Sequence, residues 1–477
     1  MRILFIASEA FPLAKVGGLA DVTSSLAIAL QDLGHEPCLI LPRYRSVRIP
    51  DQDTQGKHIV VSFRGHDEQT AVRITRLKKG IPVYLVENDD YFGTEEIYAE
   101  DELRRFLFFS LSIPAIVSQL GLYPDIIHCH DWHTALTPLW LKKAKIALPS
   151  IFTIHNVAYQ GSFDQQFFLD SGFSSVWQEY VPTGAPRPSL NFMSQGILLA
   201  DIVTTVSRTY ASEILTPQYG EGLEQLLNYR QNDLYGIVNG IDCEEYNPAT
   251  DSYLERNYDS ATIERRAGNK LALQKRGGLP QNSDIPLFGM VSRLEEQKGI
   301  DLLLQAIDQF VVETAAQLVI LGEGREHYHK SLAEAAVKYP GRLSVFIARD
   351  ERLARLIYGG CDIFLMPSRF EPCGLGQLIA MRYGAIPAVR RTGGLADTVK
   401  DVAEESGNGF VFQNYTVPEM LEAIKRAEES FYHRKEWENL MRHNMKLDFS
   451  WKASAGKYEE IYIRAKNAHQ TRDVVQK

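Results

Sequence analysis

Short apolar runs of strand length alternate with helically spaced segments along almost the whole chain. In the first half these runs occupy residues 3–7, 37–41, 82–86, 126–128, 151–154, 202–206 and 234–238. In the second half they return at residues 287–291, 318–321, 343–347, 363–366, 386–389 and 409–412. Such alternation is typical of parallel sheets whose strands are joined by crossover helices, and it predicts an α/β fold with doubly wound sheets.

The alternation is interrupted once, between the two halves, by charged residues and the turn sequence GGLP at 277–280. A chain of 477 residues is also too long for one ordinary core. We therefore predict a Rossmann-like domain at 1–240, an inter-domain crossing at 241–285 and a second Rossmann-like domain at 286–450. The final amphipathic segment, 451–477, has no strand after it and is expected to pack back on the first domain.

Composition excludes several classes of protein. The net charge of -9 argues against a nucleic-acid-binding protein, which needs a basic face. The five cysteines form no Cys-x-x-Cys pair, so neither a disulfide framework nor a zinc site is predicted. No apolar run has membrane-spanning length, and the chain starts directly with an apolar strand. We expect a cytoplasmic protein with no membrane partner.

The strand, loop and helix over 361–384 are the most informative stretch. Glu371 lies in the loop, and Cys373, Gly374 and Leu375 follow it at the expected start of the helix. Free N–H groups at a helix start suit a phosphate, and a carboxylate beside them suits sugar hydroxyls. The alternative is that Glu371 only caps the helix.

A glycine turn occurs twice, each time after a strand and before a helix. Lys15 precedes Gly17 and Gly18 in KVGGLAD, and the second half repeats this as RTGGLADT, with Thr392, Gly393 and Gly394. Glycine turns before helices are common, so one interpretation is that the two copies match by chance or by parallel need. The stronger one is two doubly wound domains that each offer a turn to a shared ligand.

Other polar side chains follow predicted strands. Arg293 and Lys298 are two cations that could together neutralise a diphosphate, although Glu295 beside them also fits an ordinary charged turn. The cluster HCHDWH at 128–133 suggests metal ligation, but its spacing does not fit the metallo-hydrolase pattern. We interpret Asp131 as a hydrogen-bonding residue for a polyol. His155 and Asn239 also stand at strand ends.

Taken together, these motifs resemble those of the bacterial glycogen synthases, the family that includes plant starch synthases. They occur in the family's order: KVGGLAD at 15–21, HDWH at 130–133, TIHNVAYQG at 153–161, VNGID at 238–242, SRLEEQKG at 292–299, PSRFEPCGL at 367–375, RTGGLADT at 391–398 and DFSW at 448–451. The resemblance implies a GT-B fold, with two Rossmann-like domains facing each other across a cleft. It also implies transfer of glucose, with retention, from ADP-glucose to the non-reducing end of an α-1,4-glucan such as glycogen or a maltooligosaccharide, without metal or cofactor.

The resemblance assigns roles to the residues already named. Catalytic roles fall to Glu371, Arg293, Lys298 and His155. Donor-binding roles fall to Lys15, Gly17, Gly18, Asp131, Asn239, Cys373, Gly374, Leu375, Thr392, Gly393 and Gly394. A retaining glycosidase uses two carboxylates, and no second one is evident opposite Glu371. We therefore favour front-face departure, in which the leaving phosphate helps deprotonate the incoming hydroxyl.

Two positions depart from the family pattern. Ile379 stands where many related transferases have a second glutamate, and Arg349 stands where synthases often have an aromatic residue. Three alternatives therefore stay open: a same-fold glucosyltransferase with another donor base or a small acceptor, a weakly active or regulatory glucan-binding paralogue, and, least favoured, a metal-dependent hydrolase.

Overall fold

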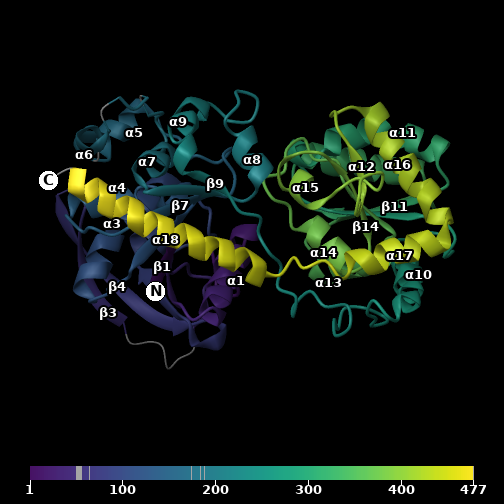
Figure 1. Ribbon diagram of the computed structural model, residues 1–477, viewed down its shortest axis with the longest axis horizontal. Coiled ribbons are helices and arrows are strands. Elements are labelled where there is room, and N and C mark those ends of the chain that lie inside the picture. The colour runs from purple at the N-terminus through teal and green to yellow at the C-terminus, as the bar shows by residue number, and fades with distance from the viewer. Residues whose placement is uncertain (50–55, 64, 173, 183, 187, 476–477) are drawn as a thin grey trace. The chain divides into compact units, whose positions relative to one another are not determined.

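The structure is a computed structural model that describes residues 1–49, 56–63, 65–172, 174–182, 184–186 and 188–475. The chain forms two compact units, one of Met1–Asn239 with Trp451–Lys477 and one of Gly240–Ser450. Each unit is built on one sheet covered by helices (Figure 1). Residues 241–285, predicted as an inter-domain crossing, lie inside the second unit and contain a helix.

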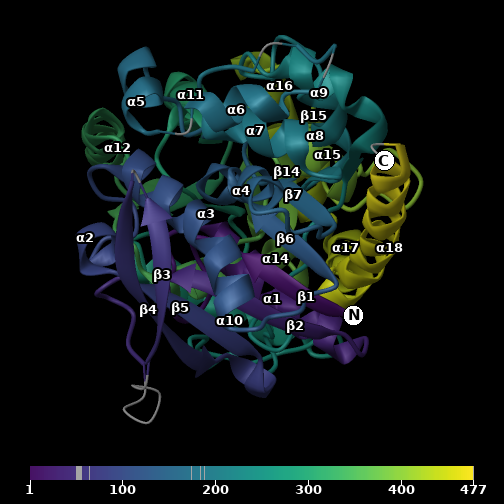
Figure 2. The same cartoon turned by 90° about the vertical axis from the view of Figure 1, so that its left-hand side faces the viewer.

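The first unit has a mixed sheet with the strand order β3-β4-β5-β2-β1-β6-β7-β8-β9 (Figure 2). The pairs β3·β4 and β4·β5 are antiparallel, and the other pairs are parallel. The strands are β1 Arg2–Ile6, β2 Glu36–Pro42, β3 Gly56–Phe63, β4 His66–Arg76, β5 Pro82–Glu87, β6 Ile126–His130, β7 Ser150–Ile154, β8 Ile202–Thr205 and β9 Leu234–Gly236. The sequence analysis missed β3 and β4.

Helices of the first unit connect these strands and cover the sheet. They are α1 Gly18–Asp32, α2 Asp89–Phe92, α3 Glu102–Gln119, α4 Thr137–Lys143, α5 Gln165–Asp170, α6 Ser174–Tyr180, α7 Phe192–Leu199, α8 Arg208–Glu213, α9 Glu224–Tyr229 and α18 Trp451–Val475. The last helix, α18, packs against α1 and runs across the first unit (Figure 1). Its Tyr462 hydroxyl lies 3.0 Å from Nδ1 of the buried His128.

The second unit has a wholly parallel sheet with the order β12-β11-β10-β13-β14-β15. Its strands are β10 Leu287–Val291, β11 Gln317–Gly322, β12 Leu343–Ile347, β13 Ile363–Met366, β14 Ile386–Arg390 and β15 Phe410–Phe412. Its helices are α10 Arg266–Arg276, α11 Ile300–Glu313, α12 Glu326–Lys338, α13 Glu351–Gly360, α14 Gly376–Arg382, α15 Gly393–Thr398, α16 Val417–Tyr432 and α17 Arg434–Asn444. The central strands are buried on both faces, which explains their continuous apolar sequences.

Both sheets have a point at which the strand order reverses. In the first sheet the chain crosses from β5 back to β6 beside β1, and in the second it crosses from β12 back to β13 beside β10. Open α/β sheets bind ligands at such switch points, outside the carboxyl ends of the strands. No helix in the described ranges is both long enough and apolar enough to cross a membrane.

Candidate active site

The switch point of the second unit brings Lys298 and Glu371 together. Lys298 Nζ donates to Oε1 and Oε2 of Glu371 at 2.8 and 2.7 Å, and the Ser368 hydroxyl lies 3.0 Å from Oε2. The Glu371 side chain is only 5% exposed and that of Lys298 is 17% exposed. The carboxylate thus binds Lys298 and Ser368 instead of capping α14, so the capping interpretation is wrong.

Two glycines allow backbone segments to approach the Glu371 loop closely. Gly299 has φ 78°, and a Cβ there would lie 2.1 Å from the carbonyl oxygen of Pro367. Gly393 has φ 43°, and a Cβ there would lie 1.9 Å from the carbonyl oxygen of Glu371. Both positions therefore require glycine. The second glycine turn holds the loop through the Gly394 N–H, which donates to that same carbonyl at 3.0 Å.

The start of α14 follows this loop. Gly374 has φ 73°, and Leu375 is the N-cap residue with no side-chain cap. Within the described part of the chain, no acceptor is found for the N–H groups of Gly374 and Leu375. These N–H donors lie within four residues of Glu371, as the sequence predicted. Cys373, in the same loop, is buried.

Arg293 is placed differently from Lys298. Its side chain is 51% exposed, and its guanidinium lies 3.0 Å from Glu295 Oε1 and 3.3 Å from Gln297 Oε1. An exposed pair of this kind contributes at most about 1 kcal/mol to stability. Arg293 can therefore exchange Glu295 for an anionic ligand at small cost.

In the first unit, Asp131 follows β6 at the switch point. Its φ is 55°, and its Oδ1 accepts the backbone N–H of His155 at 2.8 Å. Burial raises the pKa of Asp131 to about 7, against the lowering effect of the N–H groups of His155 and Asn156, and the Glu9 carboxylate raises it further. A hydrogen bond thus joins Asp131 and His155, both of which are predicted site residues.

The histidines near Asp131 are neutral; His128, His130 and His133 are buried and His155 is half-buried. Burial lowers the pKa of His128, His133 and His155 to about 3, and that of His130 well below its usual value. Nδ1 of His130 lies 3.0 Å from Nε2 of His155. A search of the described residues finds no group of three or more His, Cys, Asp or Glu side chains that could hold a metal ion.

Glu9 lies with Asp131 at the carboxyl edge of the first sheet, and the sequence analysis missed it. It follows β1, is 2% exposed, and accepts the N–H groups of Val16 and Gly17 at 2.6 and 2.9 Å. The Tyr98 hydroxyl donates to its other oxygen. The N–H of Gly17 is therefore used to hold the glycine turn in place.

The remaining predicted residues of the first unit lie along the same edge. Lys15 Nζ is 2.8 Å from Asp21 Oδ1, and its side chain is 32% exposed. Gly18 begins α1. Asn239 is 6% exposed, and its Oδ1 has no hydrogen-bond partner among the described residues.

Comparison with known proteins identifies the family. The Starch synthase catalytic domain model matches residues 2–229, and the Glycosyl transferases group 1 model matches residues 273–443. The chain is 46% identical to a glycogen synthase of Geotalea daltonii, over 97% of this chain and 98% of that protein. It is 45% identical to a glycogen synthase of Moorella thermoacetica, over 98% and 97%. The chain belongs to the glycogen synthase family.

Solved structures agree with this glycogen synthase family assignment. The catalytic domain of starch synthase IV from Arabidopsis thaliana, bound to ADP and acarbose, matches with a TM-score of 0.89 and 35% identity, over 98% of this chain and 99% of that one. A sucrose-phosphate synthase from Thermosynechococcus elongatus shares the fold, with a TM-score of 0.64 and 18% identity, over 98% and 99%. The predicted GT-B fold class and the predicted family are confirmed.

The two departures from the glycogen synthase pattern have different surroundings. Ile379, on α14, is 5% exposed and belongs to the core of the second unit. Arg349 is exposed and follows β12 at the carboxyl edge of its sheet. Ile379 is therefore a packing residue, whereas Arg349 lies where a ligand can reach it.

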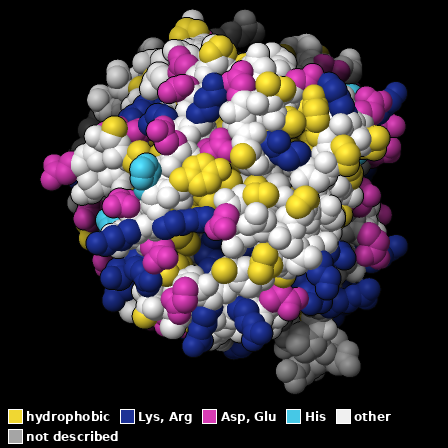
Figure 3. All heavy atoms as spheres, turned by 90° about the vertical axis from the view of Figure 1, so that its right-hand side faces the viewer, with side chains coloured by type: hydrophobic (Ala, Val, Ile, Leu, Met, Phe, Trp, Pro, Cys, Tyr) yellow, Lys and Arg dark blue, Asp and Glu magenta, His cyan; other side chains and the backbone are white. Residues whose placement is uncertain are grey.

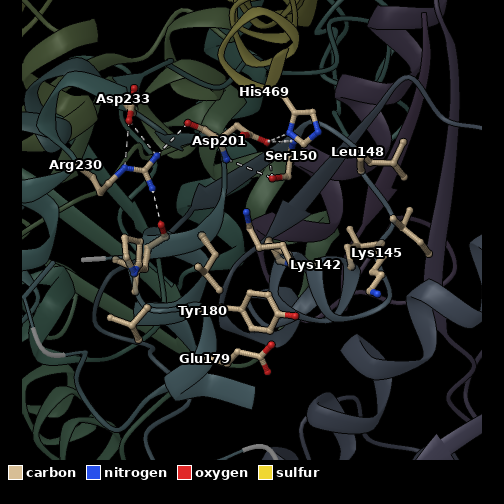
Figure 4. A pocket seen from close by; sticks show the side chains of 18 of the residues that line it. Lys142, Lys145, Leu148, Ser150, Glu179, Tyr180, Asp201, Arg230, Asp233 and His469 are labelled. Atoms are coloured by element: carbon tan, nitrogen blue, oxygen red, sulfur yellow. Dashed lines mark hydrogen bonds and ion pairs between the residues drawn. The ribbon is translucent and has the colours of Figure 1, made fainter. Parts of the chain in front are cut away.

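A large cavity of the first unit is separate from the predicted site residues. It measures about 900 Å³ and lies where β7 and β8 begin, the end of the sheet opposite Asp131. There the side chains of Ser150 and His469 both point to Asp201, whose Oδ2 accepts from Ser150 at 3.1 Å (Figure 4).

Proposed function

We propose that this protein is a glycogen synthase that transfers glucose from ADP-glucose to the non-reducing end of an α-1,4-glucan, with retention of configuration. The observation that carries the proposal is the Lys298–Glu371 pair beside the start of α14, in a chain that matches glycogen synthases along nearly its whole length. ADP and acarbose bound to the plant starch synthase support a nucleotide donor and a glucan acceptor.

The proposed mechanism uses positioned charges. Lys298 and Arg293 stabilise the negative charge that develops on the leaving diphosphate, as preorganised cations do in phosphoryl sites. Glu371, which is fixed by Lys298 and Ser368, binds glucose hydroxyls. The front-face route then needs no second carboxylate, because the departing phosphate takes the proton of the acceptor hydroxyl.

His155 acts in this proposal as a neutral side chain. Burial lowers its pKa to about 3, so at neutral pH the imidazole offers one N–H donor and one acceptor without charge. The backbone of His155 is held by Asp131. A neutral hydrogen-bonding group suits the glucosyl hydroxyls better than it suits a phosphate.

We also propose that the reaction needs neither metal nor cofactor and takes place in the cytoplasm. The support for the compartment is that Cys38, Cys129, Cys243, Cys361 and Cys373 are all free thiols. The support for metal independence is the pair of cations, Arg293 and Lys298, in the place where a metal ion would otherwise neutralise the diphosphate.

A product analysis tests the proposed linkage. Glycogen incubated with ADP-[14C]glucose and the protein becomes labelled, and β-amylase, which removes maltose from non-reducing α-1,4 ends, releases that label as maltose. Label that resists β-amylase contradicts the linkage. Label that passes to a small sugar phosphate and not to glycogen supports the small-acceptor transferase instead.

A further inference from the structure

Helices α10 and α13 of the second unit border a cavity of about 840 Å³. The two helices pack against each other, and their less polar residues, Gly268, Ala272, Leu353 and Leu356, lie in the lining. A volume of this size falls within the range of small-molecule sites. The charged residues in the lining are Glu255, Arg256, Lys275, Arg276, Asp350 and Arg352.

The four cations of this cavity are exposed and form no ion pair with any described residue. Arg256, Lys275, Arg276 and Arg352 occur in none of the salt bridges among the described residues. Lys and Arg side chains gather in the lower half of the face of the second unit that Figure 3 shows. A concentration of unpaired positive charge is unusual in a chain whose net charge is -9.

Other cations on the same two helices have clear structural partners. On α10, Lys270 Nζ lies 2.6 Å from Asp362 Oδ2, and Arg266 donates to backbone carbonyls. On α13, Arg355 lies 2.7 Å from Glu245 Oε1. The fold therefore uses these three buried cations, whereas it leaves the four around the cavity available.

The two acids of the lining do not neutralise the cavity. Asp350 is the N-cap of α13, and its Oδ1 accepts the Leu353 N–H at 2.9 Å. Glu255 is exposed. The lining thus holds four positive and two negative side chains, and one of the negative ones is committed to its helix.

We propose that this cavity binds a small ligand with two phosphate groups. Guanidinium groups bind phosphate oxygens through paired N–H donors, and a lysine adds a mobile point charge. Arg256 comes from the loop before α10, Lys275 and Arg276 from the end of α10, and Arg352 from the start of α13, so the cations surround the cavity. A concave basic site on an acidic protein fits a small polyanion better than a nucleic acid.

The side chain of Arg256 is guided toward this cavity by a glycine. A Cβ on Gly268 would lie 2.9 Å from Cγ of Arg256, so the alkyl chain of the arginine crosses α10 where that helix has no side chain. Arg256 is one of the residues that line the cavity, and the glycine leaves room for its side chain there.

Calorimetric titration of the full-length protein tests the site, with ADP present at saturating concentration so that the donor site is occupied. The probes are fructose 1,6-bisphosphate and pyrophosphate, which differ in the spacing of their phosphates. We expect one probe molecule to bind per chain. In the double variant Lys275→Glu/Arg276→Glu, and separately in Arg352→Ala, the dissociation constant should rise at least tenfold.

The matched control is Lys330→Glu/Lys435→Glu, which makes the same charge change at two exposed positions of the second unit. We expect this variant to bind the probe as the wild type does. Absence of binding of both probes to the wild type overturns the proposal. Equal weakening in the control and in the cavity variants also overturns it, because the effect would then come from net charge alone. The result is independent of glucosyl transfer.

Discussion

Replacing Lys298 by methionine removes the ammonium group that holds Glu371 and keeps a side chain of similar length. The two carboxylate oxygens lose hydrogen bonds of 2.8 and 2.7 Å, and the Glu371 side chain is 5% exposed. Removal of one partner from a buried ion pair costs about 3–5 kcal/mol. Two features reduce the expected loss of stability to about 2–3 kcal/mol. The Ser368 hydroxyl keeps its hydrogen bond to Glu371, and the Lys298 side chain is 17% exposed. For a unit of this size the melting temperature should fall by about 5–10 °C.

Two further variants separate stability from activity. The double variant Lys298→Met/Glu371→Gln removes both charges, so most of the lost melting temperature should return while nucleotide release stays absent. Arg293→Ala removes an exposed ion pair with Glu295 and a hydrogen bond to Gln297, and it should cost less than about 1 kcal/mol of stability. It should nevertheless lower the rate of nucleotide release by about 10²–10³-fold, because a donor to the leaving diphosphate is lost.

Thermal unfolding followed by circular dichroism, together with nucleotide release at neutral pH, measures both effects. A Lys298→Met variant with the same melting temperature as the wild type refutes the argument from the buried Lys298–Glu371 pair. So does a double variant that melts as low as the single one. A fully active Arg293→Ala variant refutes the assignment of that residue to the diphosphate.

Three other changes give separate tests. Glu9→Ala leaves the Val16 and Gly17 N–H groups without their acceptor and should raise KM for ADP-glucose at least tenfold. The control Glu9→Gln keeps an acceptor oxygen and should have a KM near that of the wild type. Equal KM values for the two variants contradict the role of Glu9. Because folding raises the pKa of Asp131 from 3.8 to about 7, its contribution to stability is present at low pH and is lost as the pH rises to 7, by up to about 4 kcal/mol. Urea unfolding should therefore show Asp131→Asn gaining stability over the wild type between pH 5 and 8, and parallel pH profiles would contradict this. Gly393→Ala forces a methyl group against the carbonyl oxygen of Glu371. The variant should lose nucleotide release and more than about 2 kcal/mol of stability. An active and stable variant contradicts the close packing of Gly393 against that carbonyl.

The parts of the fold that the sequence predicted are those with a simple burial pattern. Strands such as β1 and β10 are buried along nearly their whole length, so their sequences are nearly continuous apolar runs. The β3–β4 hairpin lies at the sheet edge, and its buried residues alternate with exposed ones, so it contains no continuous apolar run. Its weaker pattern explains why it was missed.

The segment before residue 286 was assigned to a crossing because its composition is polar. The helix α10 within it buries Arg266 and Lys270, which the second unit satisfies with backbone carbonyls and Asp362. Apart from the Ser283 carbonyl, which accepts from Lys270, these partners lie about 90 residues or more further along the chain, so no local pattern shows that the two cations are buried.

The sequence named many residues of the candidate site but did not show how they pair. Lys298 and Glu371 were both named, but their contact joins positions 73 residues apart and depends on β10 lying beside β13. Glu9 was not named, although two of its partners, Val16 and Gly17, lie only 7 and 8 residues away, whereas Tyr98 is distant. A carboxylate directly after the first strand was the one available signal, and the glycine turn nearby drew attention instead.

Nucleotide release from ADP-glucose and, separately, from UDP-glucose, with and without glycogen and with EDTA throughout, tests the central claim most directly. The account predicts release of ADP that depends on glycogen and is insensitive to the chelator. Release with UDP-glucose alone contradicts the donor assignment, and loss of release in EDTA contradicts the metal-free mechanism. No release from either donor contradicts the synthase function and supports a regulatory glucan-binding role, with Arg349 as the first position to change.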